Sequence, residues 1–129
     1  MDMKTFSGVN AARCISPEGF DHPIEVWDLN KWMVAACGEL GEAANILKKM
    51  NRIEEGIVNK KGETWPELRA AFGKELADTF IYLDLLARRA GFSLEQLVRD
   101  KINETSREVG WPYQIDLQAN MVRQPEEGE

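Results

Sequence analysis

The stretch GELGEAA (residues 38–44), together with KELADTF (residues 74–80), decides the fold of this chain. Each stretch carries two carboxylates three residues apart, Glu39 with Glu42 and Glu75 with Asp78. Residues with this spacing lie on one face of an α-helix, about 60° apart around its axis. The two stretches therefore predict two helices, each with a pair of acids on one side.

Apolar residues share these faces with the acids. They are Trp32, Ala35, Ala36, Ala43, Ile46 and Met50 around the first pair, and Leu68, Phe72, Tyr82 and Leu86 around the second. A soluble helix buries such a stripe against its neighbours. Buried carboxylates are costly unless they are protonated, paired or bound to a metal ion. If the two helices pack together, all four acids can meet in one cluster, which indicates a site for a hard cation.

Small residues flank both acid pairs. They are Gly38, Gly41 and Ala43 in the first helix and Ala71 and Gly73 in the second. Glycine costs about 1 kcal/mol in a helix interior. We therefore expect the helix backbones to approach closely at these positions.

Capping signals define the other helices. Asp28 or Asn30 can begin a helix that runs to about residue 52, and Thr64-Trp65-Pro66-Glu67 is a capping box that opens a helix to residue 90. A second box at Ser93 opens a helix to about residue 109, and residues 3–14 form a short helix. Residues 15–27 and 51–62 read as connections, and no strand-like alternation is present. The prediction is an all-α bundle of four to five helices.

Length and composition describe one soluble domain. The chain has 129 residues, 43% hydrophobic residues and a net charge of −6. We expect a single domain over residues 1–117 and a disordered acidic tail over 118–129. The negative charge argues against a nucleic-acid or membrane-surface partner, which would need a basic footprint. The absence of an apolar leader and the lack of metal or disulfide spacing at Cys14 and Cys37 predict a cytoplasmic protein with reduced thiols.

The ligand chemistry predicts which metal would bind. Four carboxylates without nearby histidine or cysteine suit Mg²⁺, with Mn²⁺ as a substitute. A di-iron bundle would need a Glu-x-x-His motif on each of two helices, but the single histidine, His22, lies in a predicted loop. Mg²⁺ is usually held by a few carboxylates plus the phosphates of a substrate. The acids therefore favour phosphoryl or nucleotidyl chemistry.

The segment from Trp27 to Trp111 resembles the MazG-like, all-α nucleoside triphosphate pyrophosphohydrolases. Their paired motifs, ExxE and ExxD, match residues 39–42 and 75–78, and the surrounding GELGEAANILKKM, KELADTFIYLDLLA and KINETSREVG are also similar. The resemblance implies a helical core and Mg²⁺-dependent hydrolysis of a nucleoside triphosphate, ribo or deoxy, to the monophosphate and pyrophosphate. It also implies a MazG-like bundle that oligomerises through its helices, as a homodimer or homotetramer whose sites are completed across subunits.

The resemblance assigns roles to individual residues. The expected metal ligands are Glu39, Glu42, Glu75 and Asp78, and Glu39 is also the candidate that takes the proton from the attacking water. The triphosphate is expected to contact Lys101, Asn103 and Arg107. Lys48, with the nearby Lys49 and Arg52, could serve the outer phosphates, although an exposed basic face is the alternative.

Base recognition is assigned to aromatic and amide side chains. Trp27 and Trp32 precede the first acid pair and can stack on a base, and core packing is the alternative for each. Asn30 and Asn45 could donate or accept hydrogen bonds at a base edge. The residues do not separate purine from pyrimidine, and similar proteins act on dUTP, dCTP or dGTP.

Two rival functions belong to other classes. One is a metal-dependent phosphohydrolase that acts on another phosphorylated metabolite and releases phosphate. The other is a non-enzymatic helical adaptor whose buried acids pair with basic residues of a partner subunit. Both rivals use the same acids, so only the reaction products and the metal dependence distinguish them.

Overall fold

The computed structural model describes residues 1–126 and 128, and the chain forms two compact units, Met1–Gly91 and Phe92–Glu129. A single domain over residues 1–117 was predicted from the sequence. Over the described residues the secondary structure is mostly helical, with four α-helices and a small two-stranded sheet. The all-α class is therefore confirmed for the bulk of the chain. None of these helices is long and apolar enough to cross a membrane, within the described residues.

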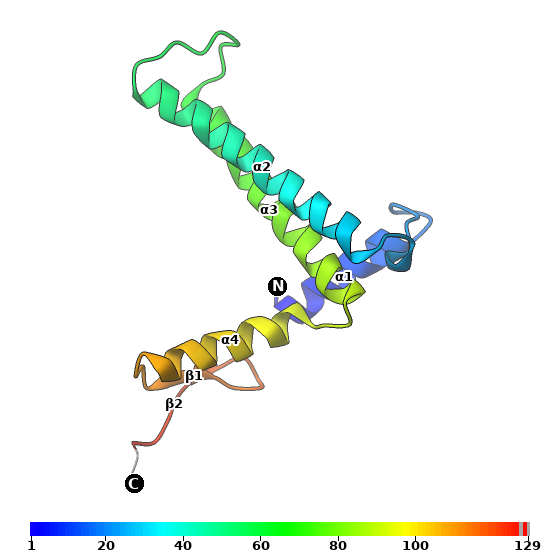
Figure 1. Cartoon of the computed structure of the whole chain (residues 1–129), viewed down its shortest axis with the longest axis vertical. Coiled ribbons are helices and arrows are strands. Elements are labelled where there is room, and N and C mark those ends of the chain that lie inside the picture. Colours follow the sequence, from blue (N-terminus) through cyan, green and yellow to red (C-terminus); the bar gives the residue numbers. More distant parts are fainter. Residues whose placement is uncertain (127, 129) are drawn as a thin grey trace. The chain divides into compact units, whose positions relative to one another are not determined.

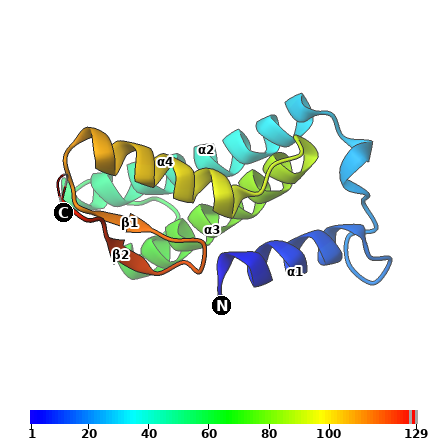
Figure 2. The same ribbon diagram turned by 90° about the horizontal axis from the view of Figure 1, so that it is seen from below.

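Two long antiparallel helices, α2 (Leu29–Glu54) and α3 (Trp65–Arg89), form the body of the first unit and lie side by side (Figures 1 and 2). Both begin at the predicted caps. Asp28 Oδ1 accepts a hydrogen bond from Lys31 N at 2.9 Å, and Thr64 and Glu67 form the reciprocal capping box. Because the start of each helix is defined by its cap, the position of each acid along its helix is defined as well.

The predicted apolar stripe of α2 is largely confirmed. Its buried residues are Trp32, Ala36, Ala43 and Met50. The buried residues of α3 are Leu68, Asp84, Leu85 and Ala87. Ala36 and Ala43 precede and follow Glu39 by one helical turn, so small side chains let α3 approach α2 beside this acid.

The N-terminal segment packs against one end of this helix pair. It consists of α1 (Met3–Ile15) and a short 3₁₀ helix, η1 (Ile24–Val26). The core here is formed by buried residues from α1, η1, α2 and α3: Ala11, Cys14, Ile24, Trp32 and Leu85. Trp27, Tyr82 and Leu86 pack on this cluster. The loop that was predicted as a plain connection therefore contributes to the core.

The expectation of close backbone approach at the glycines is wrong within the described chain. A Cβ atom built on Gly38, Gly41 or Gly73 would meet no atom within 4 Å. Ala43, by contrast, is 1% exposed and fits the expectation. The three glycines therefore lie at open positions of long helices, where no contact of the described residues requires them.

The second unit contains α4 (Leu94–Glu108) and an antiparallel hairpin of β1 (Tyr113–Ile115) and β2 (Met121–Arg123). Ser93 caps α4 as predicted, since its Oγ accepts from Gln96 N at 3.3 Å. The hairpin was not predicted. Its strands are too short for an alternating pattern to be recognised, and β2 lies in the segment predicted to be disordered. Glu127 and Glu129, the last part of that prediction, lie outside the described residues.

Candidate metal centre and adjoining pocket

Three of the four predicted acids converge. Glu39 on α2 and Glu75 and Asp78 on α3 each offer a carboxylate oxygen, and these oxygens lie within 4.8 Å of one another. Glu39 and Glu75 are half-buried, and Asp78 is exposed. The packing of α2 on α3 brings the acids together, since the two helices are far apart in the sequence. Within the described part of the chain this is the one group of three or more candidate ligands.

The fourth acid, Glu42, does not join this group. Its side chain is exposed, as is that of Asp78, and Glu39 and Glu75 are only half-buried, so the expectation of four acids pointing into the core is wrong. Glu42 is nevertheless close enough for its negative charge to contribute to the raised pKa of Glu39. It lies at the margin of the cluster.

The charges of the cluster contribute to raised pKa values of two groups, Glu39 and the neighbouring Tyr82. Burial raises the pKa of Glu39, and the neighbouring carboxylates of Glu75, Asp78 and Glu42 raise it further. The pKa of the Tyr82 hydroxyl is also raised, first by burial and then by the charges of Glu39 and Asp78. A divalent cation would relieve the part of both shifts that comes from repulsion between negative charges. The donor set consists of carboxylate oxygens only and therefore fits Mg²⁺ or Mn²⁺.

A cavity of about 330 Å³ adjoins the cluster. It is lined by residues of α1, α2, α3 and the loop between α1 and α2: Asn10, Arg13, Cys14, Phe20, His22, Trp27, Trp32, Asp78, Ile81, Tyr82 and Leu85. Asp78 thus belongs both to the acidic cluster and to the cavity wall. The volume lies at the lower end of the range of about 300–1,000 Å³ that is usual for small-molecule sites.

Aromatic rings dominate the cavity wall. His22 contacts Trp27 edge-on with ring centroids 4.8 Å apart, and Trp27 contacts Trp32 at the same centroid distance. The Trp32 indole N–H donates to Ile24 O at 3.0 Å, which fixes the ring in the core. Such edge-to-face packing makes a rigid apolar wall against which a planar ring can lie.

The predicted base-binding residues divide into two groups. Trp27 and Trp32 both line the cavity, and Trp32 is at the same time a core residue, at 2% exposure. Asn30 and Asn45 are exposed residues of α2 and do not line it. Arg13 and His22 also line the cavity, and neither was predicted from the sequence to belong to the site. Tyr82 was placed on the acid-bearing face, and its spacing of four residues from Asp78 was the available signal that it belongs to the site.

The predicted phosphate-binding residues have other partners. Lys101 is exposed and its Nζ lies 3.0 Å from Glu104 Oε1, a hydrogen bond that raises the pKa of the lysine. Arg107 donates to the Gln114 side chain at 3.3 Å. Lys48 is exposed, and it does not line the cavity. Lys101 can exchange its contact for a ligand because an exposed ion pair is weak.

Asn103 has a structural role in the second unit. Its side-chain nitrogen donates to Ile115 O at 2.8 Å, and its side-chain oxygen accepts from Ile115 N at 2.8 Å. Both ends of the amide are therefore used to attach β1 to α4. A phosphate contact of Asn103 would require at least one of these bonds to break.

Comparison of the chain with protein-family models, with curated proteins and with solved structures finds no match.

Proposed function

We propose that the protein is a Mg²⁺-dependent nucleoside triphosphate pyrophosphohydrolase of the MazG-like kind, which converts a ribo- or deoxyribonucleoside triphosphate and water into the monophosphate and pyrophosphate. The observation that carries the proposal is the double position of Asp78, which belongs to the acidic cluster and also lines the aromatic cavity. A ligand with a flat ring in the cavity would extend its charged groups toward the acids. A nucleotide has this combination of a planar base and a metal-binding phosphate chain.

The acidic cluster supplies the chemistry. The carboxylates of Glu39, Glu75 and Asp78 would hold Mg²⁺, and Glu42, at the margin of the cluster, is proposed as a further ligand. Bound Mg²⁺ would neutralise phosphate charge and make a water molecule more acidic. In the proposed reaction the oxygen of a water molecule would form a bond to the α-phosphorus while the bond from this phosphorus to the bridging oxygen would break, so that pyrophosphate leaves. Glu39, to which the resemblance assigns this step, would take the proton from the water.

The cations outside the cluster would bind the phosphates. We propose Lys48, Lys101 and Arg107 for this role, since each is exposed and carries a charge that matches a triphosphate. Asn103 is the weakest member of the predicted set because its amide is engaged by Ile115.

A second copy of the chain would cover apolar side chains that the α2–α3 pair leaves exposed. The α2–α3 pair exposes large apolar side chains along its length: Met33, Val34, Leu40, Leu47, Leu76, Phe80 and Leu83. Exposed apolar surface of this extent indicates an interaction site. We propose a homodimer or homotetramer in which the α2–α3 pairs of different copies pack on one another.

The proposed reaction is tested by product analysis. The protein with Mg²⁺ is incubated with each ribo- and deoxyribonucleoside triphosphate, and the products are separated by chromatography. Pyrophosphate and monophosphate are expected, and release of phosphate alone would favour the rival phosphohydrolase.

Glu39→Gln and Glu75→Gln should each abolish turnover with unchanged helical circular dichroism. Glu55→Gln, which changes an exposed acid at the far end of α2, should leave turnover unchanged. Wild-type turnover in either cluster variant would reject the assignment.

A further inference from the structure

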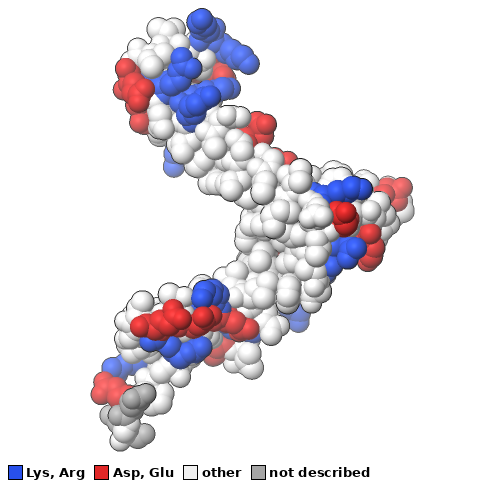
Figure 3. Space-filling model, in the orientation of Figure 1, with Lys and Arg blue, Asp and Glu red and all other residues white. Residues whose placement is uncertain are grey.

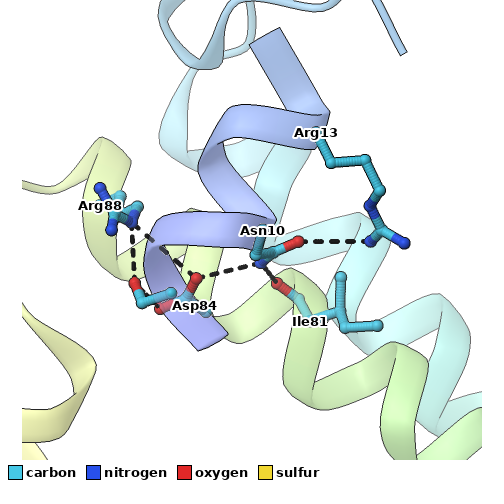
Figure 4. Close-up of polar contacts among 6 residues, drawn as sticks. Asn10, Arg13, Ile81, Asp84 and Arg88 are labelled. Atoms are coloured by element: carbon cyan, nitrogen blue, oxygen red, sulfur yellow. Dashed lines mark hydrogen bonds and ion pairs between the residues drawn. The ribbon is translucent and has the colours of Figure 1, made fainter. Parts of the chain in front are cut away.

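A buried carboxylate on α3 lies outside the acidic cluster and links α3 to α1 (Figure 4). Asp84 is 0% exposed. Its Oδ1 accepts a hydrogen bond from Ser7 Oγ at 2.6 Å, and its Oδ2 accepts from Asn10 Nδ2 at 3.0 Å. Arg88 Nε lies 3.9 Å from Oδ2 and donates to Ser7 Oγ at 2.8 Å. A buried charge is tolerated only when it is paired and hydrogen-bonded in this way.

The network fixes the orientation of the Asn10 amide. Asn10 is 3% exposed, and its Nδ2 donates both to Asp84 and to the backbone oxygen of Ile81, at 3.0 Å each. Both of its N–H groups are thereby used. The amide oxygen must then point the other way, and it accepts from Arg13 Nη2 at 3.4 Å (Figure 4). The buried aspartate thus sets the direction from which the arginine is held.

Arg13 is the side chain that this network presents to the cavity. It lines the cavity wall, and its guanidinium carbon lies 5.2 Å from the centre of the Phe20 ring. Arginine has five N–H donors and no acceptor, and one nitrogen is directed to Asn10. The Asn10 donors are taken, and Asp78 belongs to the acidic cluster. Arg13 is therefore the one cation among the described residues that line the cavity, and it has free donors to offer beside the Trp27 indole N–H and the Tyr82 hydroxyl.

One further polar atom, His22 Nδ1, is buried without a hydrogen-bond partner among the described residues. It belongs to a residue of the same cavity wall. A histidine ring nitrogen can donate or accept, depending on its tautomer. Because His22 can serve either kind of ligand atom, the charged fork of Arg13, which can only donate, is the feature of the wall that favours a ligand with two neighbouring acceptors.

We propose that Arg13, oriented by Asn10 and Asp84, makes the cavity select bases that carry a carbonyl oxygen (guanine, cytosine, uracil or thymine) over adenine. This inference rests on the proposed function, which identifies the ligand as a nucleotide. A guanidinium fork binds two neighbouring acceptors, such as O6 and N7 of guanine. Adenine places an amino donor at the equivalent edge, which would face a donor of Arg13 and leave both unpaired.

The first test measures kcat/KM for dGTP, dCTP, dUTP, dTTP and dATP. The wild type should prefer its best carbonyl base over dATP by about ten- to a hundredfold, which corresponds to one good forked contact. Arg13→Met should remove this preference through KM with little change in kcat, and Arg13→Lys should restore only part of it because a lysine has no fork. Lys4→Met, an exposed cation of the same helix, should behave as the wild type. An equal loss for all five nucleotides in Arg13→Met would overturn the proposal.

The second test separates positioning from general stability. Asp84→Asn keeps the shape of the side chain but places an amide donor against Ser7 or Asn10. It should weaken the preference for carbonyl bases in the wild-type background and have no further effect on the preference in Arg13→Met. A variant that only loosens the fold would lower turnover of every nucleotide in both backgrounds. That outcome would refute the positioning role.

A binding measurement distinguishes this inference from the proposed reaction. Titration of the protein with dGMP, dCMP, dUMP, dTMP and dAMP without metal needs no turnover, and it can be followed by intrinsic tryptophan fluorescence, to which Trp27 and Trp32 of the cavity wall contribute. A preference for at least one carbonyl base over dAMP that disappears in Arg13→Met supports the inference even if no triphosphate is cleaved, in which case only the hydrolase proposal fails. Equal binding of all five monophosphates, or no binding, overturns it.

Discussion

At the scale of single residues, the raised pKa of Glu39 has a consequence for stability. A carboxyl whose pKa is higher in the folded state stabilises the fold below its unfolded pKa, and this contribution is lost as the pH rises through the folded value. In the metal-free protein the ionisation of Glu39 beside the other acids of the cluster is therefore expected to destabilise the fold at neutral pH. A bound cation would reverse this effect, because it favours the ionised form.

Glu39→Gln is accordingly expected to raise the thermal midpoint of the metal-free protein at neutral pH and to have little effect near pH 3, where the wild-type carboxyl is protonated. Adding Mg²⁺ or Mn²⁺ should stabilise the wild type more than the variant. Unfolding followed by circular dichroism across pH, with and without metal, measures both effects. A variant less stable than the wild type at pH 7 without metal would contradict the assigned direction of the pKa shift.

The residues of the site were predictable where their partners follow from helix geometry. Helical spacing and a place on the apolar stripes were sufficient to predict that Glu39, Glu75 and Asp78 converge. Asp84 gave no such signal, because its partners Ser7 and Asn10 lie 77 and 74 residues away in the sequence. Long-range contacts of this kind follow from the docking of α1, and helix periodicity does not predict that docking.

At the scale of elements, local capping chemistry predicted the long helices well. The Thr64 capping box is present with both of its hydrogen bonds, and α3 ends at Arg89, next to the predicted end at residue 90. The β1–β2 hairpin was missed because its connection depends on the Asp116 side chain, which accepts from the backbone N–H groups of Gln118 and Asn120. Such a turn is held by one residue and leaves little trace in hydrophobic periodicity.

The open glycines of α2 allow a test of what covers this helix. Gly38→Ala and Gly41→Ala meet empty space within the described chain, so in an isolated subunit each should stabilise the helix by about 1 kcal/mol. If the backbone of a second copy packs on these positions, the added methyl groups should instead weaken association. Urea unfolding and sedimentation measure the two effects, with Gly8→Ala in α1, also at an open position, as the control. Added stability with unchanged assembly would place the interface elsewhere.

At the scale of the whole molecule, the exposed apolar face of the α2–α3 pair is the main feature that the single chain leaves unexplained. Leu40 is 54% exposed, immediately beside Glu39 in the sequence, and Leu76 is 45% exposed beside Glu75. Apolar side chains at these positions surround the candidate metal ligands. Assembly of copies through this face would therefore also exclude water from the cluster and strengthen its electrostatic interactions.

Leu40→Glu is expected to dissociate the proposed oligomer, because it would bury an unpaired charge between subunits. In a monomer the same change would be nearly neutral, since exposed substitutions usually alter stability by no more than about 0.5 kcal/mol. Sedimentation should show the wild type at two or four times the 14.7 kDa chain mass and the variant at the monomer mass with reduced turnover. Val58→Glu, at an 83% exposed loop position, should remain assembled and active. A wild type that sediments as a monomer at micromolar concentration, or a Leu40→Glu variant that stays assembled, would remove this face from the proposed interface.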